Sequence, residues 1–407
     1  MSRPEIAVTG IGMVTPAGTD TPSTWQAVCA GTPTATTLAQ LAGMPVDFGC
    51  TIPDFQPDLV LGRRTAYRLD RATQLILAAA DEALRDAGLD SRTWDGNRVA
   101  VVIGGSLNGA QTWETQYQRL RDHGPRHVSA LLIPMIVPST PAGEIALAHQ
   151  VTGPSLVTAT ACASGATAIV TARDLLLSDQ CDIAITGGTE SSITPFISTG
   201  FAQLGVLSAR ADDPARASRP FDQTRDGFVM AEAAAALILE RAHHAAARGR
   251  RPRALLAGSG STTDAHHPTA PHPQGHGAKQ AMRNALADAG LTHHDIAHVN
   301  SHGTSTVLND AVEAEAIRTV LPSGPMVTSA KGALGHSLAA AGAVEAALTV
   351  LSLEHDLIPP TVNLDSPDPG FDLNFVTKAA AGQRIDAALS NSFGFGGHNV
   401  VLAFRTP

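Results

Sequence analysis

Cysteine, aromatic residues and positive charge are all scarce in this 407-residue chain, and each scarcity excludes a class of protein. The four cysteines, Cys29, Cys50, Cys162 and Cys181, form no C-x-x-C pair and have no regular spacing, which excludes a zinc knuckle and a disulfide scaffold. Aromatic residues make up 4% of the chain and hydrophobic residues 43%, which favours tightly packed helices and sheets over a disordered or coiled-coil chain. The net charge of −9 argues against general binding to nucleic acid or anionic membranes, although a local basic patch could still recruit an acidic partner.

Long apolar segments are also missing. No run of about 18 uninterrupted apolar residues occurs, so we expect no membrane-spanning helix. The N-terminal stretch MSRPEIAVTGIGMVTPAG enters a strand within a few residues and lacks the apolar core of a signal peptide. With the cysteine pattern of a reducing compartment, these absences predict a soluble, cytoplasmic protein.

A repeated phrase gives the chain its organisation. Residues 83–89 read ALRDAGL and precede the apolar stretch RVAVVIGGS, and residues 285–291 read ALADAGL and precede DIAHVNSHGTS. Each copy predicts a helix that ends at Asp-Ala-Gly and is followed by a strand. Two copies about 200 residues apart indicate an internal duplication, in a chain too long for one simple core.

The remaining segments of each half alternate between strand and helix and close with a pair of strands. This order predicts an α/β fold with two mixed sheets and with helices between and outside them. A charged stretch, RAHHAAARGRRPR, marks the expected boundary, which divides the chain into residues 1–250 and residues 251–407. If a pseudo-twofold axis relates the halves, the strand-to-helix junctions at Cys162 and near Lys331 face a shared crevice.

Cys162 stands in TATACASGATA, where a β-branched run gives way to small residues and a predicted helix. At a helix N-terminus, the unpaired N–H groups and the helix dipole favour a thiolate, the nucleophilic form of cysteine. A small buried cysteine is the alternative interpretation. Two further segments, NSHGTST with His302 and SAKGALGHS with Lys331 and His336, are expected in the same crevice. A thiolate can hold an acyl group as a thioester, and imidazoles can donate hydrogen bonds to a carbonyl oxygen that gains negative charge.

Taken together, these motifs resemble the β-ketoacyl-acyl carrier protein synthases, the condensing enzymes of fatty acid and polyketide assembly. The resemblance extends over essentially the whole chain, through VTGIGMVTPAG, TACASG, RPFDQTRDGFVMAEAA, NSHGTST, SAKGALGHSLAAAG and NSFGFGGHN. The Cys, His, His set is that of the elongating branch, since the initiating enzymes carry Cys, His, Asn. The resemblance implies the thiolase fold, a duplicated αβαβα arrangement with two mixed five-stranded sheets.

The resemblance also implies roles for single residues. Cys162 is similar to the family's acyl-accepting nucleophile, and His302 and His336 to the pair that stabilises the enolate formed when malonyl thioester loses carbon dioxide. Lys331 resembles the residue that orients this network, with Glu313 as its carboxylate partner. The other implied positions are the gate and oxyanion-hole residue Phe395, the phosphopantetheine contacts Thr304 and Thr306, the acyl-tunnel residues Leu107 and Phe201, and the substrate-binding residue Phe393.

The implied reaction is a two-step condensation. An acyl chain moves from acyl carrier protein to Cys162, and malonyl-acyl carrier protein then loses carbon dioxide and attacks the thioester, which lengthens the chain by two carbons. We expect no metal and no other cofactor, because decarboxylation supplies the carbon nucleophile. The family is dimeric, so we expect either a homodimer or a heterodimer with a chain length factor.

Two charged or histidine-rich segments have competing interpretations. LGRRTAYRLDR, with Arg63, Arg64 and Arg68, is either a solvated helix face or, together with Arg126, a docking site for an acidic carrier protein. DAHHPTAPHPQGHG carries four histidines and could hold a metal. Its prolines and glycines instead predict a loop, and it matches the family's second gating loop.

Departures from the family pattern bear on the pathway. Ser301 stands where the family usually has alanine, and VLND replaces a shorter, glycine-containing turn of the fatty acid enzymes. We therefore favour a type II polyketide or polyene pathway over housekeeping fatty acid elongation. Cys162 argues against a non-catalytic chain length factor, in which the nucleophile is replaced. A thiolase would need a second cysteine near the C-terminus, and a pure scaffold gives no reason to keep Cys162, His302, His336 and Lys331 together.

Overall fold

The computed structural model describes residues 4–379 and 383–407. Its strands are β1 (Ile6–Val14), β2 (Thr36–Thr37), β3 (Phe48–Gly49), β4 (Val99–Gly104), β5 (Ser155–Thr158), β6 (Ile183–Glu190), β7 (Ala233–Arg241), β8 (Ala254–Thr263), β9 (His298–Asn300), β10 (Met326–Thr328), β11 (Asn374–Phe375), β12 (Ala387–Gly394) and β13 (His398–Arg405). Its α-helices are α1 (Thr21–Cys29), α2 (Arg63–Tyr67), α3 (Arg71–Ala87), α4 (Ala110–His123), α5 (Leu132–Ile136), α6 (Thr140–Ala148), α7 (Ser164–Leu177), α8 (Pro195–Gln203), α9 (Ala242–Ala247), α10 (His276–Ala289), α11 (Val307–Val320), α12 (Lys331–Leu334) and α13 (Ala341–His355).

The predicted duplication is visible in the strand order. The first half runs β5-β4-β6-β7-β1 and the second runs β10-β9-β12-β13-β8, with the short β11 added at the far edge. In both halves the first three strands pair in parallel and the last two pair antiparallel to their neighbours. The two five-stranded sets are not separate sheets, because β1 pairs with β8 over two residues and joins all eleven strands into one ladder.

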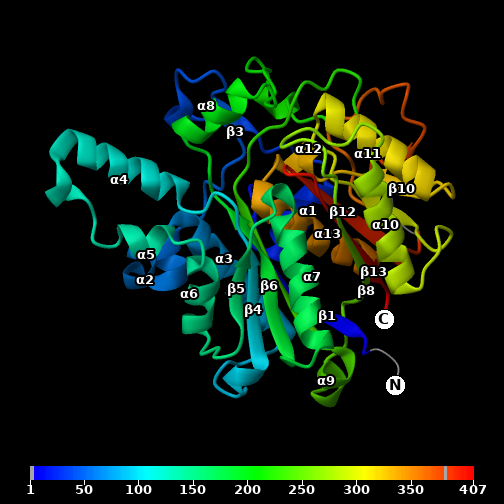
Figure 1. Ribbon diagram of the computed structural model, residues 1–407, viewed down its shortest axis with the longest axis horizontal. Helices are drawn as coiled ribbons and strands as arrows, with labels where there is room; N and C mark the ends of the chain where they lie inside the picture. Colours follow the sequence, from blue (N-terminus) through cyan, green and yellow to red (C-terminus); the bar gives the residue numbers. More distant parts are fainter. Residues whose placement is uncertain (1–3, 380–382) are drawn as a thin grey trace.

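Helices form the remaining layers (Figure 1). Residues of α7 and α13 fill the apolar core between the two strand sets. Helix α3 covers the outer face of the first set with α6, and α10 and α11 cover that of the second. Helices α3 and α10 both end at a glycine with φ 66°, Gly88 and Gly290, as the repeated Asp-Ala-Gly phrase predicts.

Glycines bring the covering helices unusually close to the sheet. A Cβ on Gly12 of β1 would lie 2.0 Å from the carbonyl oxygen of Ala79 in α3. The matching position in the second half, Gly260 of β8, would place a Cβ 2.0 Å from the carbonyl oxygen of Ala281 in α10. The same close strand-to-helix contact therefore recurs in both halves, and only glycine permits it.

The segment after Lys331 is broken where its sequence reads as one continuous helical stretch. Helix α12 ends at Gly335, whose φ is 70°, and α13 begins only at Ala341. His336 therefore lies between two helices. The stretch Leu338–His355 is long and apolar enough to cross a membrane by length and composition, but 89% of it is buried, so it is the central core helix of the fold.

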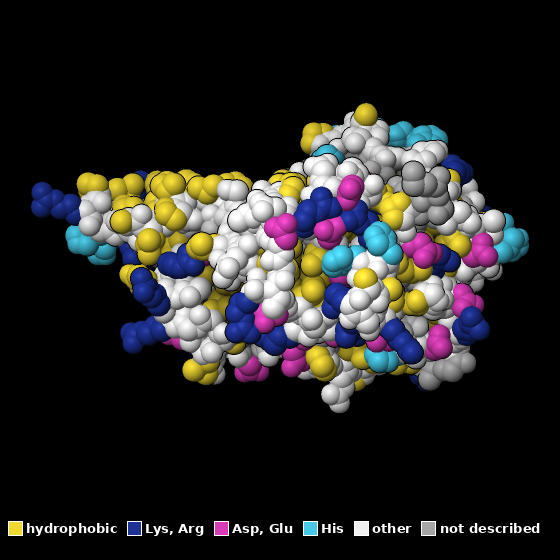
Figure 2. All heavy atoms as spheres, turned by 90° about the horizontal axis from the view of Figure 1, so that it is seen from below, with side chains coloured by type: hydrophobic (Ala, Val, Ile, Leu, Met, Phe, Trp, Pro, Cys, Tyr) yellow, Lys and Arg dark blue, Asp and Glu magenta, His cyan; other side chains and the backbone are white. Residues whose placement is uncertain are grey.

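A lobe formed by α4 and α5 projects from the body of the molecule beside α2 and α6 (Figure 1). Figure 2 shows hydrophobic side chains gathered along one edge of this lobe, with Lys and Arg near its end. The exposed large apolar residues of α4, α5 and the turn after it are Trp113, Tyr117, Leu120, Ile133 and Val137. An apolar surface of this kind is typical of a protein interface.

Candidate active site

Cys162 lies in a single 3₁₀ turn, Ala161–Ala163, between β5 and α7. The turn begins with Ala161 at φ 49°, a left-handed conformation that is costly for any residue with a Cβ. Ser164 stabilises it, because its hydroxyl donates to the carbonyl of Ala161 (2.6 Å) and accepts from the backbone N–H of Thr160 (2.9 Å). The cysteine is thus held at the strand-to-helix junction that the sequence predicts.

The prediction that Cys162 favours the thiolate is wrong for the resting site. Burial raises the pKa of its thiol to about 11, and the nearby charge of Lys331 lowers it only in part. The backbone N–H groups of Phe395 and of Cys162 itself also act on the sulfur and lower the pKa. Both N–H groups therefore face the sulfur, where backbone donors are able to stabilise negative charge.

His302 and His336 lie with Cys162 in the lining of one pocket of about 210 Å³. Their rings are 5.4 Å apart between centroids and nearly perpendicular. Burial holds the pKa of both imidazoles well below the usual 6.5, and the charge of Lys331 lowers both further. Both rings are therefore neutral at physiological pH, and each can donate one hydrogen bond and accept another.

Lys331 orients His302. Its Nζ donates to the carbonyl oxygen of His302 (2.6 Å) and lies 3.4 Å from Nδ1 of the same residue. Because an ammonium group only donates, Nδ1 must be the acceptor in that contact, which places the ring proton on Nε2. This is the tautomer that can offer a hydrogen bond to a substrate oxygen.

The predicted partnership of Lys331 with Glu313 is wrong. Lys331 instead forms a buried ion pair with Glu345 of α13. Glu313 of α11 lies behind the His302 loop, where it accepts from the backbone N–H groups of His302 (2.8 Å) and Gly303 (2.7 Å) and from Asn391 (3.0 Å). Glu313 thus positions the histidine loop through its backbone.

The other predicted substrate contacts divide between two cavities. Thr304, Thr306, Phe201, Phe393 and Phe395 line the same pocket as Cys162, and the two threonine hydroxyls are 2.9 Å apart. Leu107 does not line that pocket. It packs on the apolar cluster that includes Cys162 and Phe201, but faces a separate open cavity of about 850 Å³ beneath the α4 lobe.

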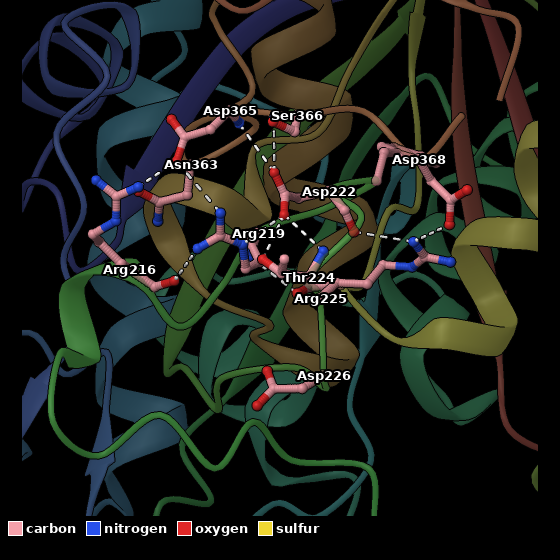
Figure 3. Close-up of polar contacts among 12 residues, drawn as sticks. Arg216, Arg219, Asp222, Thr224, Arg225, Asp226, Asn363, Asp365, Ser366 and Asp368 are labelled. Carbon is pink, nitrogen blue, oxygen red and sulfur yellow. Dashed lines mark hydrogen bonds and ion pairs between the residues drawn. The ribbon is translucent and has the colours of Figure 1, made fainter. Parts of the chain in front are cut away.

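A loop preceding β7 clasps the C-terminal half near the pocket (Figure 3). At its centre Asp222, which is 1% exposed, pairs with Arg219 (3.0 Å) and accepts from the backbone N–H groups of Thr224 (2.8 Å), Asp365 (3.2 Å) and Ser366 (2.9 Å). Through these contacts it ties residues 219–224 to residues 365–366. We refer to these two segments together as the clasp.

The clasp also holds the turn of the His302 motif. The backbone N–H of Arg219 donates to the hydroxyl of Ser305 (3.0 Å), and that of Gly227 donates to the Ser305 carbonyl (3.0 Å). Ser305 itself has φ 69°. A strained residue persists only where its surroundings fix it, so the clasp supports the geometry of the turn that carries Thr304 and Thr306.

The histidine-rich segment is a loop against the Phe395 turn. Gly396 donates to the carbonyl of Pro268 (2.7 Å), Asp264 donates to that of Gly397 (2.8 Å), and Thr269 and Pro271 line the pocket. Among the described residues, no group of three or more His, Cys, Asp or Glu side chains could hold a metal ion. The placement agrees with the loop interpretation of this segment.

The basic residues proposed for docking lie away from the pocket lining. Arg63 and Arg64 are exposed on α2, and Arg126 is exposed after α4. Arg68 is engaged within the chain, because it forms an ion pair with Glu144 of α6 (2.5 Å). Three of the four predicted arginines are therefore exposed, and the fourth, Arg68, is partly exposed but paired. Helix α2, which carries Arg63 and Arg64, lies beside the α4 lobe (Figure 1).

Sequence reasoning missed two buried charged residues of the site. Glu345 is the single charged residue among the buried residues of α13, and that isolation could have indicated its role. Arg225, 4% exposed, contacts the backbone of Thr306 and Val307, and nothing in the local sequence indicates this. The first could have been found from its apolar surroundings, whereas the second depends on a contact across about 80 residues of chain.

Comparison with known families places two consecutive domain models on the chain. The model of the beta-ketoacyl synthase N-terminal domain matches residues 3–245, and that of the C-terminal domain matches residues 253–365. The 3-oxoacyl-[acyl-carrier-protein] synthase 2 of Synechocystis is 39% identical over 410 residues, which covers 100% of this chain and 99% of the relative.

Solved structures agree with this comparison. The structure described as the ishigamide ketosynthase/chain length factor superposes with a TM-score of 0.93 at 30% identity and covers 100% of both chains. A second, in which a type II PKS acyl-carrier protein is in complex with its ketosynthase, superposes with a TM-score of 0.92 at 28% identity and the same coverage. The predicted thiolase-type α/β fold is confirmed by these neighbours.

Proposed function

Because the chain belongs to the beta-ketoacyl synthase family, we propose that its condensation chemistry is carried out by Cys162, His302 and His336 in the pocket described above. The chain is an elongating β-ketoacyl-acyl carrier protein synthase, an acyltransferase that joins an acyl thioester to malonyl-acyl carrier protein. The observation that carries the residue assignment is the lining of one pocket by the thiol, both neutral imidazoles and the Phe395 turn.

In the first half-reaction the Cys162 sulfur attacks the thioester carbonyl of an acyl-acyl carrier protein. The thiol loses its proton as the C–S bond forms, and the negative oxygen is stabilised by the N–H groups of Cys162 and Phe395. The phosphopantetheine sulfur leaves with the bonding electrons and takes up a proton. The acyl group then remains on Cys162 as a thioester.

In the second half-reaction malonyl-acyl carrier protein binds with its thioester oxygen toward His302 and His336. Loss of carbon dioxide leaves an enolate, whose oxygen accepts hydrogen bonds from the two neutral rings. The enolate carbon attacks the acyl carbonyl, and the Cys162 sulfur leaves and is reprotonated. The product is a β-ketoacyl-acyl carrier protein two carbons longer, and no metal or redox cofactor is needed.

Intact-mass spectrometry tests these assignments. The native protein incubated with an acyl-acyl carrier protein gains the mass of the acyl group, and Cys162→Ala does not. Cys162→Ala supplied with malonyl-acyl carrier protein still releases carbon dioxide, because the two histidines remain, whereas His302→Ala and His336→Ala lose this release. An acylated Cys162→Ala variant would disprove the nucleophile assignment.

For the pathway we propose polyketide or polyene assembly, with housekeeping fatty acid elongation as the alternative. Ser301 and the Val307–Asp310 stretch, where the sequence departs from the fatty acid enzymes, both lie at the His302 turn, and the Ser301 hydroxyl donates to the carbonyl of Thr328 (2.8 Å). Loading of Cys162 by carrier proteins that bear acyl chains of graded length and unsaturation tests the choice. Preferential loading with saturated chains of every length would favour fatty acid elongation.

We also propose a dimer that covers the α4 lobe, either with a second copy or with a chain length factor. The exposed apolar residues of that lobe and the open cavity bearing Leu107 support this proposal. Light scattering of the isolated chain and of the chain co-expressed with a chain length factor decides between the two. A dimer in the first sample indicates a homodimer, and a monomer that becomes a dimer only in the second indicates a heterodimer.

Docking of an acidic acyl carrier protein on Arg63, Arg64, Arg68 and Arg126 is a further proposal. The exposure of Arg63, Arg64 and Arg126 supports it, and the ion pair of Arg68 with Glu144 reduces the contribution expected of that residue. Replacing Arg64 and Arg68 by Glu should raise KM for acyl carrier protein without slowing reaction with a short pantetheine thioester. Equal loss with both substrates would contradict it. We expect this activity in the cytoplasm.

A further inference from the structure

Two exposed apolar side chains stand at the mouth of the catalytic pocket. Val307 and Leu308 form the first turn of α11 and are 56% and 61% exposed, yet both line the pocket that contains Cys162. Large apolar side chains that remain in water are common singly, but a pair at the opening of a reaction pocket indicates a contact surface.

The backbone under this pair is fixed by a buried cation, Arg225. The Arg225 guanidinium donates to the carbonyl oxygens of Thr306 (3.3 Å) and Val307 (3.2 Å). The same group donates to the carbonyl of Asp222 (3.0 Å) and pairs with Asp368 (2.9 Å). The backbone that carries the two apolar side chains is therefore already ordered. A partner that covers them loses little binding free energy to the ordering of this backbone.

The charges of the pocket narrow the identity of that partner. Among the described residues that line it, none is Lys or Arg, and the acidic ones are Asp226 and Asp264. The lining therefore offers no Lys or Arg side chain to an acidic partner, and the contact that Val307 and Leu308 offer is apolar. A second copy of this chain seated on Val307 and Leu308 would close the pocket through which substrate must reach Cys162. The occupant must be a protein that delivers its substrate through that opening.

We infer that Val307 and Leu308 form an apolar contact site for the acyl carrier protein, beside the point where its phosphopantetheine arm enters the pocket. This inference rests on the proposed carrier-protein substrate. It adds an apolar contact to the ionic contacts proposed for Arg63, Arg64, Arg68 and Arg126. The two kinds of contact can be distinguished, because salt screens charges at the surface but does not weaken apolar burial.

The test compares a thioester on the carrier protein with the same acyl group on free pantetheine, which lacks both the protein and the phosphate of the arm. We compare the native chain, the double variant Val307→Ser with Leu308→Ser, and a matched control, Arg318→Ser, which lies about three turns further along α11. Each is acylated with hexanoyl-acyl carrier protein or hexanoyl-pantetheine. We expect KM for the carrier-bound substrate to rise about tenfold in the double variant, the equivalent of burying one such side chain. KM for hexanoyl-pantetheine should rise much less than KM for the carrier-bound substrate, and the larger rise should persist in 0.5 M salt, roughly a concentration that screens exposed charges within about 4 Å.

The other outcomes have separate meanings. An equal rise with both thioesters would show that the pair contacts the arm alone, and no rise would show that it contacts nothing; either result overturns the inference. A rise that disappears in high salt would also overturn it. Failure of the native chain to be acylated by either substrate would instead disprove the proposed function.

Arg225→Lys tests this ordered backbone separately. Lysine keeps the charge but cannot reach both carbonyls with a planar fork, so KM for the carrier-bound substrate should rise while Val307 and Leu308 are intact. The ratio of KM for the carrier-bound substrate to KM for hexanoyl-pantetheine should therefore rise, which distinguishes loss of this surface from a general loss of the site. An unchanged KM for both substrates would show that Arg225 stabilises the fold without presenting this surface.

Discussion

Cys162 rests as a thiol in a pocket where its protonated form is favoured. Burial raises its pKa to about 11, and the opposing charge of Lys331 and the N–H groups of Phe395 and Cys162 offset this only in part. In the proposed mechanism the same N–H groups stabilise the negative oxygen that forms when a thioester is attacked. A protonated resting thiol is also protected from oxidation, which requires the thiolate.

The tight contact between the Phe395 turn and the nucleophile is a residue-scale constraint. A Cβ on Gly394 would lie 2.5 Å from the carbonyl oxygen of Thr160 and 3.2 Å from the backbone nitrogen of Cys162. Gly394→Ala should displace one of the oxyanion donors and lower the acylation rate of Cys162 by about 10²-fold or more. Rates from intact-mass spectrometry check this, with Gly143→Ala as the control because a Cβ there meets nothing within 4 Å. Equal rates in both variants would refute the predicted displacement.

The pair of Lys331 and Glu345 gives a second residue-scale prediction. Burial raises the pKa of the Glu345 carboxyl to about 7, and the charge of Lys331 opposes this rise. Each member of the ion pair therefore stabilises the charged form of the other. Glu345→Gln should destabilise the protein by about 3–5 kcal/mol, because it leaves a buried ammonium unpaired. Release of carbon dioxide from malonyl-acyl carrier protein should fall with it, since Lys331 would no longer hold His302.

The double variant Lys331→Met with Glu345→Leu separates the two effects. Removing both charges should restore much of the melting temperature, because an apolar pair of similar volume replaces a buried ion pair at little cost. Carbon dioxide release should remain low, since His302 has lost the donor that fixes its tautomer. Recovery of activity together with the melting temperature would show that the pair is only structural.

At the scale of elements, the clasp connects segments that are far apart in the chain but meet near the pocket. Residues 219–224 precede β7, and residues 365–366 follow α13. Burial tends to raise the pKa of Asp222, but Arg219 and the backbone donors outweigh it and the pKa is lowered. A carboxyl with a lowered folded pKa contributes stability above its unfolded pKa, and that stability is lost as the pH falls toward the folded value.

Asp222→Asn should therefore weaken the clasp at neutral pH, by about 3 kcal/mol if it behaves as a broken buried pair. The amides of Thr224, Asp365 and Ser366, which donate to this carboxylate, should exchange faster with deuterium. Hydrogen-exchange mass spectrometry measures the change, and Asp368→Asn, at a carboxylate that is 33% exposed, should have a smaller effect. Unchanged exchange at those amides would show that the clasp does not depend on the charge of Asp222.

Across the whole molecule, folding buries histidines that would be protonated in the unfolded chain. His298 in β9 is fully buried, neither of its ring nitrogens has a partner among the described residues, and burial lowers its pKa to about 3. Below pH 6.5 the unfolded chain binds a proton at this position that the folded chain does not bind. The contribution of His298 to the free energy of unfolding therefore decreases by about 1.4 kcal/mol per pH unit as the pH falls from about 6.5 toward 3.

His298→Phe should remove this dependence. As the pH falls from 6.5 to 5, the free energy of unfolding of the native chain should decrease by roughly 2 kcal/mol more than that of the variant. Chemical denaturation at several pH values measures it, and His243→Phe at an exposed position provides the control. A difference that does not change with pH would contradict the assignment to His298.

Much of this architecture follows from local sequence. The repeated Asp-Ala-Gly phrase, the alternation of apolar strands with helices and the Cys162 junction depend on patterns within a few residues of each other, so they predict the duplicated α/β fold and the position of the nucleophile. Cys162, His302 and His336 line one pocket, as their motifs predicted, whereas Lys331 does not line it and instead contacts His302 from its buried position.

Tertiary structure alone decided the charges and the partners. The resting thiol, the neutral histidines, the pairing of Lys331 with Glu345 in place of Glu313, and the position of Leu107 in a second cavity all depend on burial and on contacts between distant segments. A pKa is set by the free energy of transferring a charge from water into its folded surroundings, and neither those surroundings nor the distances within them are written in the local sequence. The sequence thus determined which motifs come together at the site, and the fold determined the protonation of their side chains and the partner of each one.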